Sequence, residues 1–315
     1  MFLNQSLNSI LSLMESWSYI NHENIDRLKY KEAVDRSSGH GNIYAEDFVW
    51  DILHPGWDLL VSGDYDLVVP LPHKRKWFCT SFRQPIFMRT IPLIGGSFSS
   101  HSFQQICAIL EANCALVHLN FSFDAYDKWS GIGTYQLLDL LEDMSLQRAL
   151  YSANAKRILK NSKDNLVFEN NIEPADFITF FKKHVGFKYG NLSELHYSRL
   201  KALVDAAIGK EIGSISAISF EGAPIAMSFF IDLNGVRYYV KGASSEAAKE
   251  VGAMYHLIDH GIEMAIAKGL KKFDFVGSNA KGMAEFNKKF GAKDVSYGIY
   301  KSNDLAWPLS MFFNS

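Results

Sequence analysis

The stretch DFVGSNAKGMAEFNKKFGAKDVSYGIYK, residues 274–301, is the most informative part of the sequence. It begins with a short apolar run that leads into Gly277 and Ser278, and it continues as a compact helical pattern that ends before Gly291. β-Branched and aromatic residues follow. Glycine after the last periodic residue is a usual helix stop, and the following pattern is typical of a strand. The stretch therefore predicts a strand, a loop, a helix and a second strand in succession.

The composition is that of a globular chain with ample material for a core. The chain has 315 residues, of which 48% are hydrophobic and 21% charged, and this length suggests two domains. The net charge of −2 excludes a global field that would attract nucleic acid or anionic lipid. The three cysteines lack the spacing of a zinc site or a disulfide framework, so no metal is expected.

Residues 1–17 contain an apolar stretch, but they lack a basic leading region and a small-residue cleavage site, and Glu15 interrupts the pattern. No window approaches the ~20 apolar residues that a membrane span needs. We therefore expect a cytoplasmic protein without a membrane span.

The N-terminal half reads as strands and helices in alternation. Two β-rich runs in residues 57–72 flank Ser62-Gly63-Asp64, which is a hairpin pattern. Further strands are expected in residues 77–94, 115–121 and 135–140, with a helix over residues 102–112.

The pattern changes near residue 146. A basic helix and a strand over residues 165–170 are followed by helices over 174–184 and 192–208, and then by a three-stranded meander over 213–243. The Glu221-Gly222 and Asn234-Gly235 pairs suit its tight turns. We place the domain boundary near residue 145, with domains over 1–144 and 145–315.

The helix expected over residues 252–268 has apolar residues at i, i+3, i+4, i+7 and i+8 from Met254, the period of a helix that packs on a sheet. His256, Asp259 and His260 are expected on its opposite, solvated face. The HxxxH spacing is therefore interpreted as surface rather than as a metal site.

This order of elements resembles the GNAT superfamily of N-acetyltransferases, and more closely its FemAB-like branch, within which it resembles an uncharacterised acetyltransferase group common in bacteria. The resemblance lies in residues 44–72, 83–85, 151–163, 237–243 and 274–292. It implies an α/β (α+β) fold class with two GNAT-like domains, each a mixed, mostly antiparallel sheet flanked by helices.

The resemblance also implies a donor site in the loop over residues 242–252, where a helix N-terminus would hold the pyrophosphate of acetyl-CoA or another acyl-CoA. Met254 stands where the family has a small residue, so an ordinary strand–helix connection stays an alternative. The candidate cofactor-binding residues are Ser244, Ser245, Lys249, Gly252 and Ala253.

Asn287 departs from the family pattern. Many GNAT enzymes read LYEKLGF here, and their tyrosine protonates the departing thiolate. An amide cannot transfer a proton at useful pH, although its NH₂ group could orient a substrate carbonyl. The resemblance and the residues together make Asn287, Tyr297 and Lys241 the candidate catalytic residues, with Tyr300 as a second substitute for the tyrosine.

Four further residues are candidates for substrate binding: Arg157 and Lys156 of the basic helix, Gln84 of the Arg-Gln-Pro stretch, and Ser278. The basic helix lies at the expected domain junction, which is a preferred place for pockets.

The leading hypothesis is an acyltransferase that moves an acyl group, acetyl in the first place, from a CoA-type donor to a small-molecule or peptide amine. Its site is expected between the two domains. One alternative is a FemAB-type aminoacyl transferase that uses aminoacyl-tRNA on a cell-wall peptide precursor. The other is a catalytically silent GNAT-like binding module.

Overall fold

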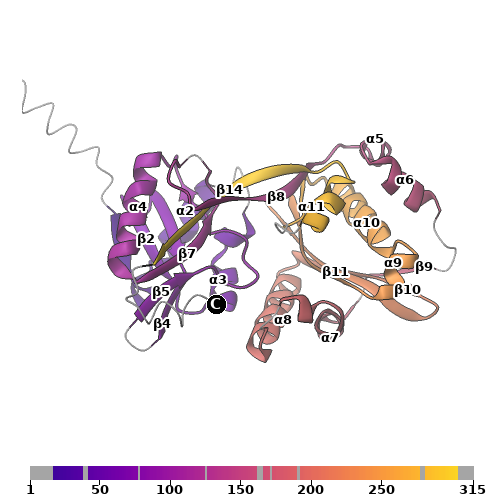
Figure 1. Cartoon of the computed structure of the whole chain (residues 1–315), viewed down its shortest axis with the longest axis horizontal. Helices are drawn as coiled ribbons and strands as arrows, with labels where there is room; N and C mark the ends of the chain where they lie inside the picture. Colours follow the sequence, from indigo (N-terminus) through magenta and orange to yellow (C-terminus); the bar gives the residue numbers. More distant parts are fainter. Residues whose placement is uncertain are drawn as a thin grey trace, which may run out of the picture. The chain divides into compact units, whose positions relative to one another are not determined.

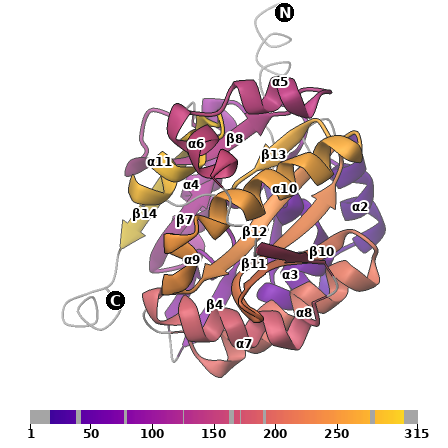
Figure 2. The ribbon, with the colours of Figure 1, turned by 90° about the vertical axis from the view of Figure 1, so that its right-hand side faces the viewer.

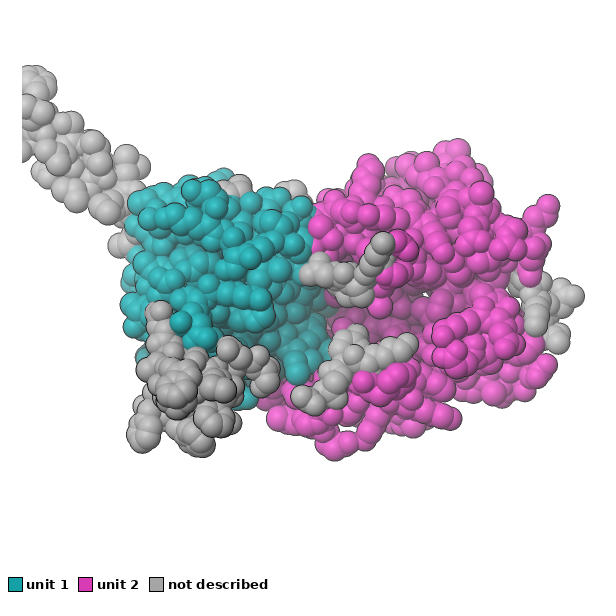
Figure 3. All heavy atoms as spheres, in the orientation of Figure 1, with its two compact units in different colours: residues 1–133, 296–315 teal, residues 134–295 magenta. Residues whose placement is uncertain are grey.

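The computed structural model describes residues 17–37, 42–76, 79–124, 126–161, 166–170, 172–189, 192–276 and 281–303. The chain forms two compact units, coloured separately in Figure 3: unit 1 contains residues 1–133 and 296–315, and unit 2 contains residues 134–295. The chain changes unit inside two strands, β8 (Gly131–Asp139) and β14 (Lys293–Asn303). The expected division into 1–144 and 145–315 has a single boundary, whereas these units share the chain at two places.

Unit 1 contains a small antiparallel sheet and a second group of strands. The small sheet has the order β1 (Trp17–Ile20), β2 (Asp58–Ser62), β3 (Leu67–Leu71) and β6 (Ile94–Gly95). Strands β2 and β3 form the predicted hairpin, with Asp58 opposite Leu71.

The second group of unit 1 has the order β4 (His73–Lys76), β5 (Cys79–Arg83), β7 (Leu116–Phe121) and β14. Pairing is antiparallel except between β5 and β7. The described residues of unit 1 include the helices α2 (Arg27–Arg36), α3 (Asp47–Leu53) and α4 (Ser100–Asn113).

Unit 2 has the strand order β8, β13, β12, β11, β10 and β9. The bounds are Lys272–Asp274 for β13, Val236–Ser244 for β12, Ala223–Leu233 for β11, Gly213–Phe220 for β10 and Leu166–Glu169 for β9. All neighbours are antiparallel except β12 and β13. The predicted turns are present, and the positive φ angles of Asn234 (48°) and Gly235 (76°) suit a tight hairpin.

Helices cover both faces of the unit 2 strands, α7 and α8 on one side and α10 and α11 on the other (Figures 1 and 2). The basic helix expected after residue 146 is divided into two. The bounds are Met144–Ala149 for α5, Ala153–Lys160 for α6, Pro174–His184 for α7, Glu194–Gly209 for α8, Glu246–Glu250 for α9, Ala253–Ala267 for α10 and Lys281–Lys288 for α11. The expected mixed α/β class, with antiparallel-dominated sheets flanked by helices, is confirmed.

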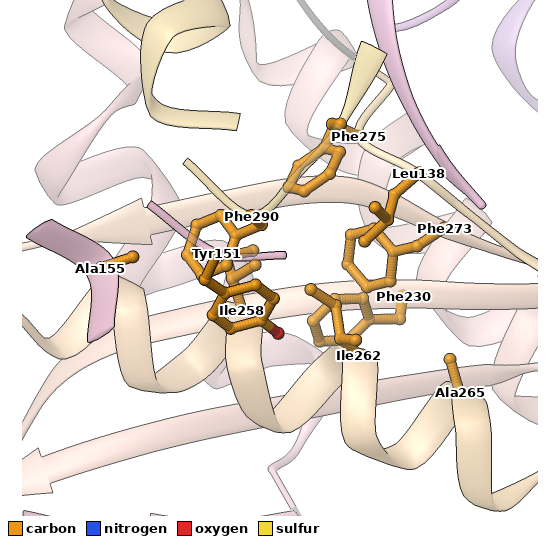
Figure 4. Packing of buried hydrophobic residues seen from close by; sticks show 11 residues of the cluster. Leu138, Tyr151, Ala155, Phe230, Ile258, Ile262, Ala265, Phe273, Phe275 and Phe290 are labelled. Atoms are coloured by element: carbon orange, nitrogen blue, oxygen red, sulfur yellow. The ribbon is translucent and has the colours of Figure 1, made fainter. Parts of the chain in front are cut away.

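The apolar face of α10 forms the centre of unit 2. Ile258, Ile262 and Ala265 are fully buried, and they face aromatic side chains that include Phe230 and Phe273 (Figure 4). The period predicted for this helix is confirmed. Within the described part of the chain, α10 and the other helices lack the length and apolarity needed to cross a bilayer.

The expectation of a solvated opposite face on α10 is wrong. His256 and Asp259 are each only 8% exposed, because further elements cover this side of the helix. Asp259 accepts hydrogen bonds from Arg148 of α5, with an Nη2–Oδ2 distance of 2.7 Å. The sequence period marks the face that packs on the sheet, but it does not show that a second layer lies over the other face.

Candidate functional site

Two parallel strands part in the middle of unit 2. The pairing of β12 with β13 runs from Val236–Lys272 to Tyr238–Asp274, and β13 ends there while β12 continues to Ser244. The ladder on this side of β12 therefore stops six residues before the strand does. Backbone edges where neighbouring strands part can hydrogen-bond to a ligand.

A cavity of about 420 Å³ lies where the strands part. It is lined mainly by apolar side chains from β12, the α9–α10 region, α11 and the end of α7. The lining residues are Val185, Tyr239, Gly242, Ala243, Ser244, Ala248, Lys249, Gly252, Met254, Tyr255, Met283, Phe286 and Asn287. All of them belong to unit 2. Met283 of α11 is 48% exposed and forms part of this wall.

Tyr239 is a cavity residue that the sequence analysis missed. A Cβ atom on Gly242 would overlap the Tyr239 hydroxyl, so glycine is what allows this hydroxyl to lie against the strand. The close approach depends on a β-bulge: Lys241 is opposite Phe229 and Tyr239 is opposite Phe230, which leaves Val240 without a partner in the register. The only signal in the sequence is the Tyr-Val-Lys-Gly spacing, which does not reveal a bulge.

The start of α10 is built on Gly252. This residue is the N-cap and has φ of +65°, and a Cβ atom added to it would lie 2.5 Å from Ile158 Cγ2. Both its backbone conformation and the space available require glycine. Replacement of Gly252 would thus disturb the fold as well as any ligand.

The loop before α10 offers little free positive charge. Lys249 donates to both carboxylate oxygens of Glu246, at 3.0 and 2.8 Å. Glu250 adds another negative charge at the end of α9. A diphosphate at this helix N-terminus would depend on backbone N–H groups rather than on lysine.

Asn287 is buried, with 1% of its surface exposed, and lines the cavity. Its Nδ2 donates to Gln136 Oε1 at 3.0 Å, and Gln136 Nε2 donates in turn to Asp294 Oδ1 at 3.0 Å. The side-chain NH₂ that we expected to orient a substrate carbonyl is thus engaged with Gln136. Asn287 Oδ1 is buried and accepts no hydrogen bond from the residues that the structure describes.

The structure brings four of the predicted site residues together around the cavity: Ser244, Lys249, Gly252 and Asn287. Five other described candidates from the same unit do not line the cavity: Lys241, Ser245, Ala253, Lys156 and Arg157, the last two on α6. Lys156 donates to the carbonyl oxygen of Ala149 at 2.8 Å. Arg157 donates to Asn154 Oδ1 at 3.0 Å. Ser278 lies outside the described residues.

Two predicted site residues belong to unit 1. Gln84 uses both ends of its side-chain amide within that unit, accepting from the backbone N–H of Asn120 at 2.9 Å and donating to the carbonyl oxygen of Met88 at 3.2 Å. Tyr297 is 6% exposed and packs against Gly133. Tyr300, the other tyrosine of β14, donates to Glu111 Oε1 at 2.5 Å.

Comparisons with known proteins agree with this architecture. Residues 175–287 match the family model of the acetyltransferase (GNAT) domain. The sequence matches no curated protein. Among similar solved structures, FemX has a TM-score of 0.65 at 12% identity, and the match covers 91% of this chain and 98% of FemX.

Two other solved structures share the fold. A tandem GNAT protein from the clavulanic acid biosynthesis pathway has a TM-score of 0.55 at 11% identity, covering 91% of this chain and 98% of that one. N-myristoyltransferase of Saccharomyces cerevisiae, solved with myristoyl-CoA and inhibitors, has a TM-score of 0.50 at 11% identity, covering 94% and 82%. Residues 175–287 of unit 2 are therefore similar to a GNAT acetyltransferase domain, and the chain shares its fold with FemX and the tandem GNAT protein.

Proposed function

We propose that the protein is an acyltransferase that moves an acyl group, acetyl in the first place, from a CoA-type thioester to an amine, with the unit 2 cavity as its donor site. One observation carries the proposal. Every lining residue, from Val185 to Asn287, falls within residues 175–287, the segment that matches the GNAT family model, and the cavity opens where β12 and β13 part.

The cavity suits the thioester arm of such a donor. An extended arm has alternating amide groups and methylene groups. Its amides can pair with the backbone edge of β12 beyond Tyr238, and its methylenes can lie against Met254 and Phe286. Myristoyl-CoA bound to the yeast protein of similar fold supports an acyl-CoA as the class of donor.

The reaction is a displacement at the thioester carbonyl. The amine nitrogen attacks the carbonyl carbon, a C–N bond forms and the C–S bond breaks. The attacking nitrogen loses a proton, and the departing thiolate gains one. Asn287 cannot supply that proton, so we assign this role to the hydroxyl of Tyr239, a residue that lines the cavity. Tyr297 and Lys241 stay predictions for the same chemistry.

Binding and turnover test this proposal. We expect acetyl-CoA to raise the melting temperature and to bind with a heat signal in titration calorimetry. Mass spectrometry of the protein incubated with acetyl-CoA and a panel of amines, including L-lysinamide, should detect the N-acetyl product. Absence of any acetyl-CoA binding to the wild-type protein would overturn the assignment of the donor.

The Tyr239→Phe variant tests the proton donor. It should lower kcat by roughly 10²–10⁴-fold, the usual contribution of general acid catalysis, with little change in the Kd of acetyl-CoA. Tyr255→Phe is the comparison variant, because Tyr255 also lines the cavity and its hydroxyl oxygen accepts hydrogen bonds from Lys289 at 2.8 Å and from Asn154 at 3.3 Å. Equal activity of the two variants would contradict the assignment to Tyr239.

A second candidate is transfer of an aminoacyl group from aminoacyl-tRNA to a cell-wall peptide precursor, in which an ester bond breaks instead of a thioester bond. The pairing of Lys249 with Glu246 favours it, since the loop has little free charge for a diphosphate. Transfer of radiolabel from aminoacyl-tRNA, without acetyl-CoA binding, would select this activity. Binding of neither donor would indicate a catalytically silent module.

A further inference from the structure

A chain of three polar side chains leads from the surface of unit 2 to the cavity. Gln136 of β8 is fully buried, and Asn287 of α11 is 1% exposed. Gln136 lies between Asn287 and Asp294 of β14, with 3.0 Å between the paired atoms on each side. Asp294 is exposed and forms an ion pair with Lys288 at 2.5 Å.

The charge on Asp294 fixes the direction of every hydrogen bond in this chain. Lys288, together with the Gln136 amide, holds the pKa of Asp294 below its usual range, so the carboxylate is ionised and can only accept. Gln136 must turn its NH₂ group toward Asp294, and its Oε1 therefore faces Asn287. Asn287 must in turn direct its NH₂ group at Gln136, which assigns the otherwise ambiguous orientation of both amides.

This orientation leaves a buried carbonyl oxygen, on a residue that lines the cavity, without a partner among the described residues. Asn287 Oδ1 is buried and accepts no hydrogen bond from the described residues, and the surrounding lining is mainly apolar. A buried acceptor without a donor destabilises a protein, so its retention is expected where a ligand supplies the donor. The ligand group must carry an N–H or O–H hydrogen.

We infer that Asn287 Oδ1 accepts a hydrogen bond from an N–H group of the bound substrate, and that Asp294 sets this polarity through Gln136. The identity of the substrate rests on the proposed function. In an acyl transfer from a CoA-type donor to an amine, N–H groups occur on the amides of the thioester arm and on the attacking amine. Asn287 is then a binding residue, whereas Gln136 and Asp294 are positioning residues.

The polarity can be tested without any ligand by a double-mutant cycle. Asn287→Asp places a second acceptor beside Gln136, whose single NH₂ group cannot serve carboxylates on both sides, so the variant should melt well below wild type. Adding Asp294→Asn should restore part of the loss, because the new amide at this position can donate to a reversed Gln136. In the same background, Lys288→Met removes the ion pair but keeps the carboxylate, and it should restore nothing.

Failure of Asp294→Asn to raise the melting temperature of Asn287→Asp would overturn the assigned polarity. This outcome does not depend on any donor, so it is distinct from failure of the proposed function, which is absence of acetyl-CoA binding to wild type.

The ligand contact has its own test, with acetyl-CoA and L-lysinamide as probes. Asn287→Leu keeps the approximate volume and removes the acceptor. If the contact is to the thioester arm, this variant should weaken the Kd of acetyl-CoA at least tenfold. If the contact is to the attacking amine, the Kd of acetyl-CoA should be unchanged while kcat/KM for L-lysinamide falls at least tenfold.

Asn287→Leu is expected to change either the Kd of acetyl-CoA or kcat/KM for L-lysinamide. Asp294→Asn should change the same one of these two quantities in the same direction, but by a smaller factor, because it allows both amide orientations. Lys288→Met should leave both quantities unchanged. A merely structural role for Asn287 predicts lower stability with both quantities intact, and that result would overturn the inference.

Discussion

Gly252 lines the cavity and has a backbone conformation that side chains rarely adopt. The residue has φ of +65° at the start of α10, and Ile158 of α6 occupies the place where a side chain would lie. A side chain here must strain the backbone and also displace the Ile158 side chain. The glycine that resembles part of a phosphate-binding pattern is therefore required for packing, whatever it binds.

We predict that Gly252→Ala lowers the free energy of unfolding by roughly 1–3 kcal/mol, as expected for a non-glycine residue in a strained region of backbone. Gly282→Ala in α11 is the control, since no heavy atom lies within 4 Å of its added Cβ. The control should be neutral or stabilising by up to about 1 kcal/mol. Urea denaturation measures both, and equal effects of the two substitutions would refute the explanation.

At the scale of elements, α10 carries two histidines whose Nε2 atoms are buried without a hydrogen-bond partner among the described residues, His256 and His260. Burial is the main cause that lowers the pKa of each imidazole below its ordinary value. The charge of Asp259 acts in the opposite direction and raises the pKa of both histidines. For His260, Glu263 also raises the pKa, whereas Arg237 lowers it. Both rings are therefore favoured in the neutral form in the folded protein.

This arrangement predicts a stability that falls in mild acid. Because the pKa is lower in the folded protein, the unfolded chain binds protons first as the pH falls. The contribution of the neutral histidines to the free energy of unfolding is therefore fully present above the ordinary histidine pKa of about 6.5, and it is lost as the pH falls through the lower pKa of the folded protein. His256→Gln with His260→Gln should flatten the slope of unfolding free energy between about pH 7 and 5. His101→Gln, an exposed position on α4, should leave it unchanged. An unchanged slope in the double variant would contradict the prediction.

Helix α9 changes the charge beside the cavity, because Glu246 pairs with Lys249, which lines it. We predict that Glu246→Gln releases this lysine, removes a negative charge and tightens acetyl-CoA binding a few-fold, with the gain shrinking at high salt. Asp205→Asn on α8 also releases a paired lysine, Lys201, and serves as the control. Calorimetry at two salt concentrations measures the difference. A gain that persists at high salt would argue against a charge effect.

Much of the fold of unit 2 could be predicted from local patterns. The Asn234-Gly235 turn and the apolar period of α10 depend on neighbouring residues, and both appear in the structure as expected. The bulge at Val240 could not be predicted, because simple alternation along β12 does not show where the register slips. It brings Tyr239 and Gly242 together at the cavity and leaves Lys241 out of the lining.

The hydrogen bonding of Asn287 also could not be predicted from its neighbours in the sequence. The motif around it identified the helix and the departure from tyrosine. Its hydrogen-bond partner, Gln136, is 151 residues away in sequence. No pattern within the 274–301 stretch indicates which atom of the amide is left for a ligand.

At the scale of the whole molecule, strand β14 joins the two units through the chain. Residues Gly298–Asn303 pair with β7 of unit 1, whereas the strand begins with residues of unit 2. We predict that deletion of residues 296–315 exposes the edge of β7 and lowers its hydrogen-exchange protection, with a smaller effect on β11. Lys301→Ala, an exposed position on β14, should leave this protection unchanged. Undiminished protection of β7 in the truncated protein would contradict the prediction.

The place of β14 in the chain has a consequence for synthesis. A ribosome makes the whole of residues 134–295 before it makes residues 298–303, which pair with β7. Unit 2 can acquire its strands while unit 1 still lacks one of its own. The N-terminal part of the protein is therefore the last to be completed, and until then β7 presents an open edge that a chaperone could cover or another nascent chain could invade.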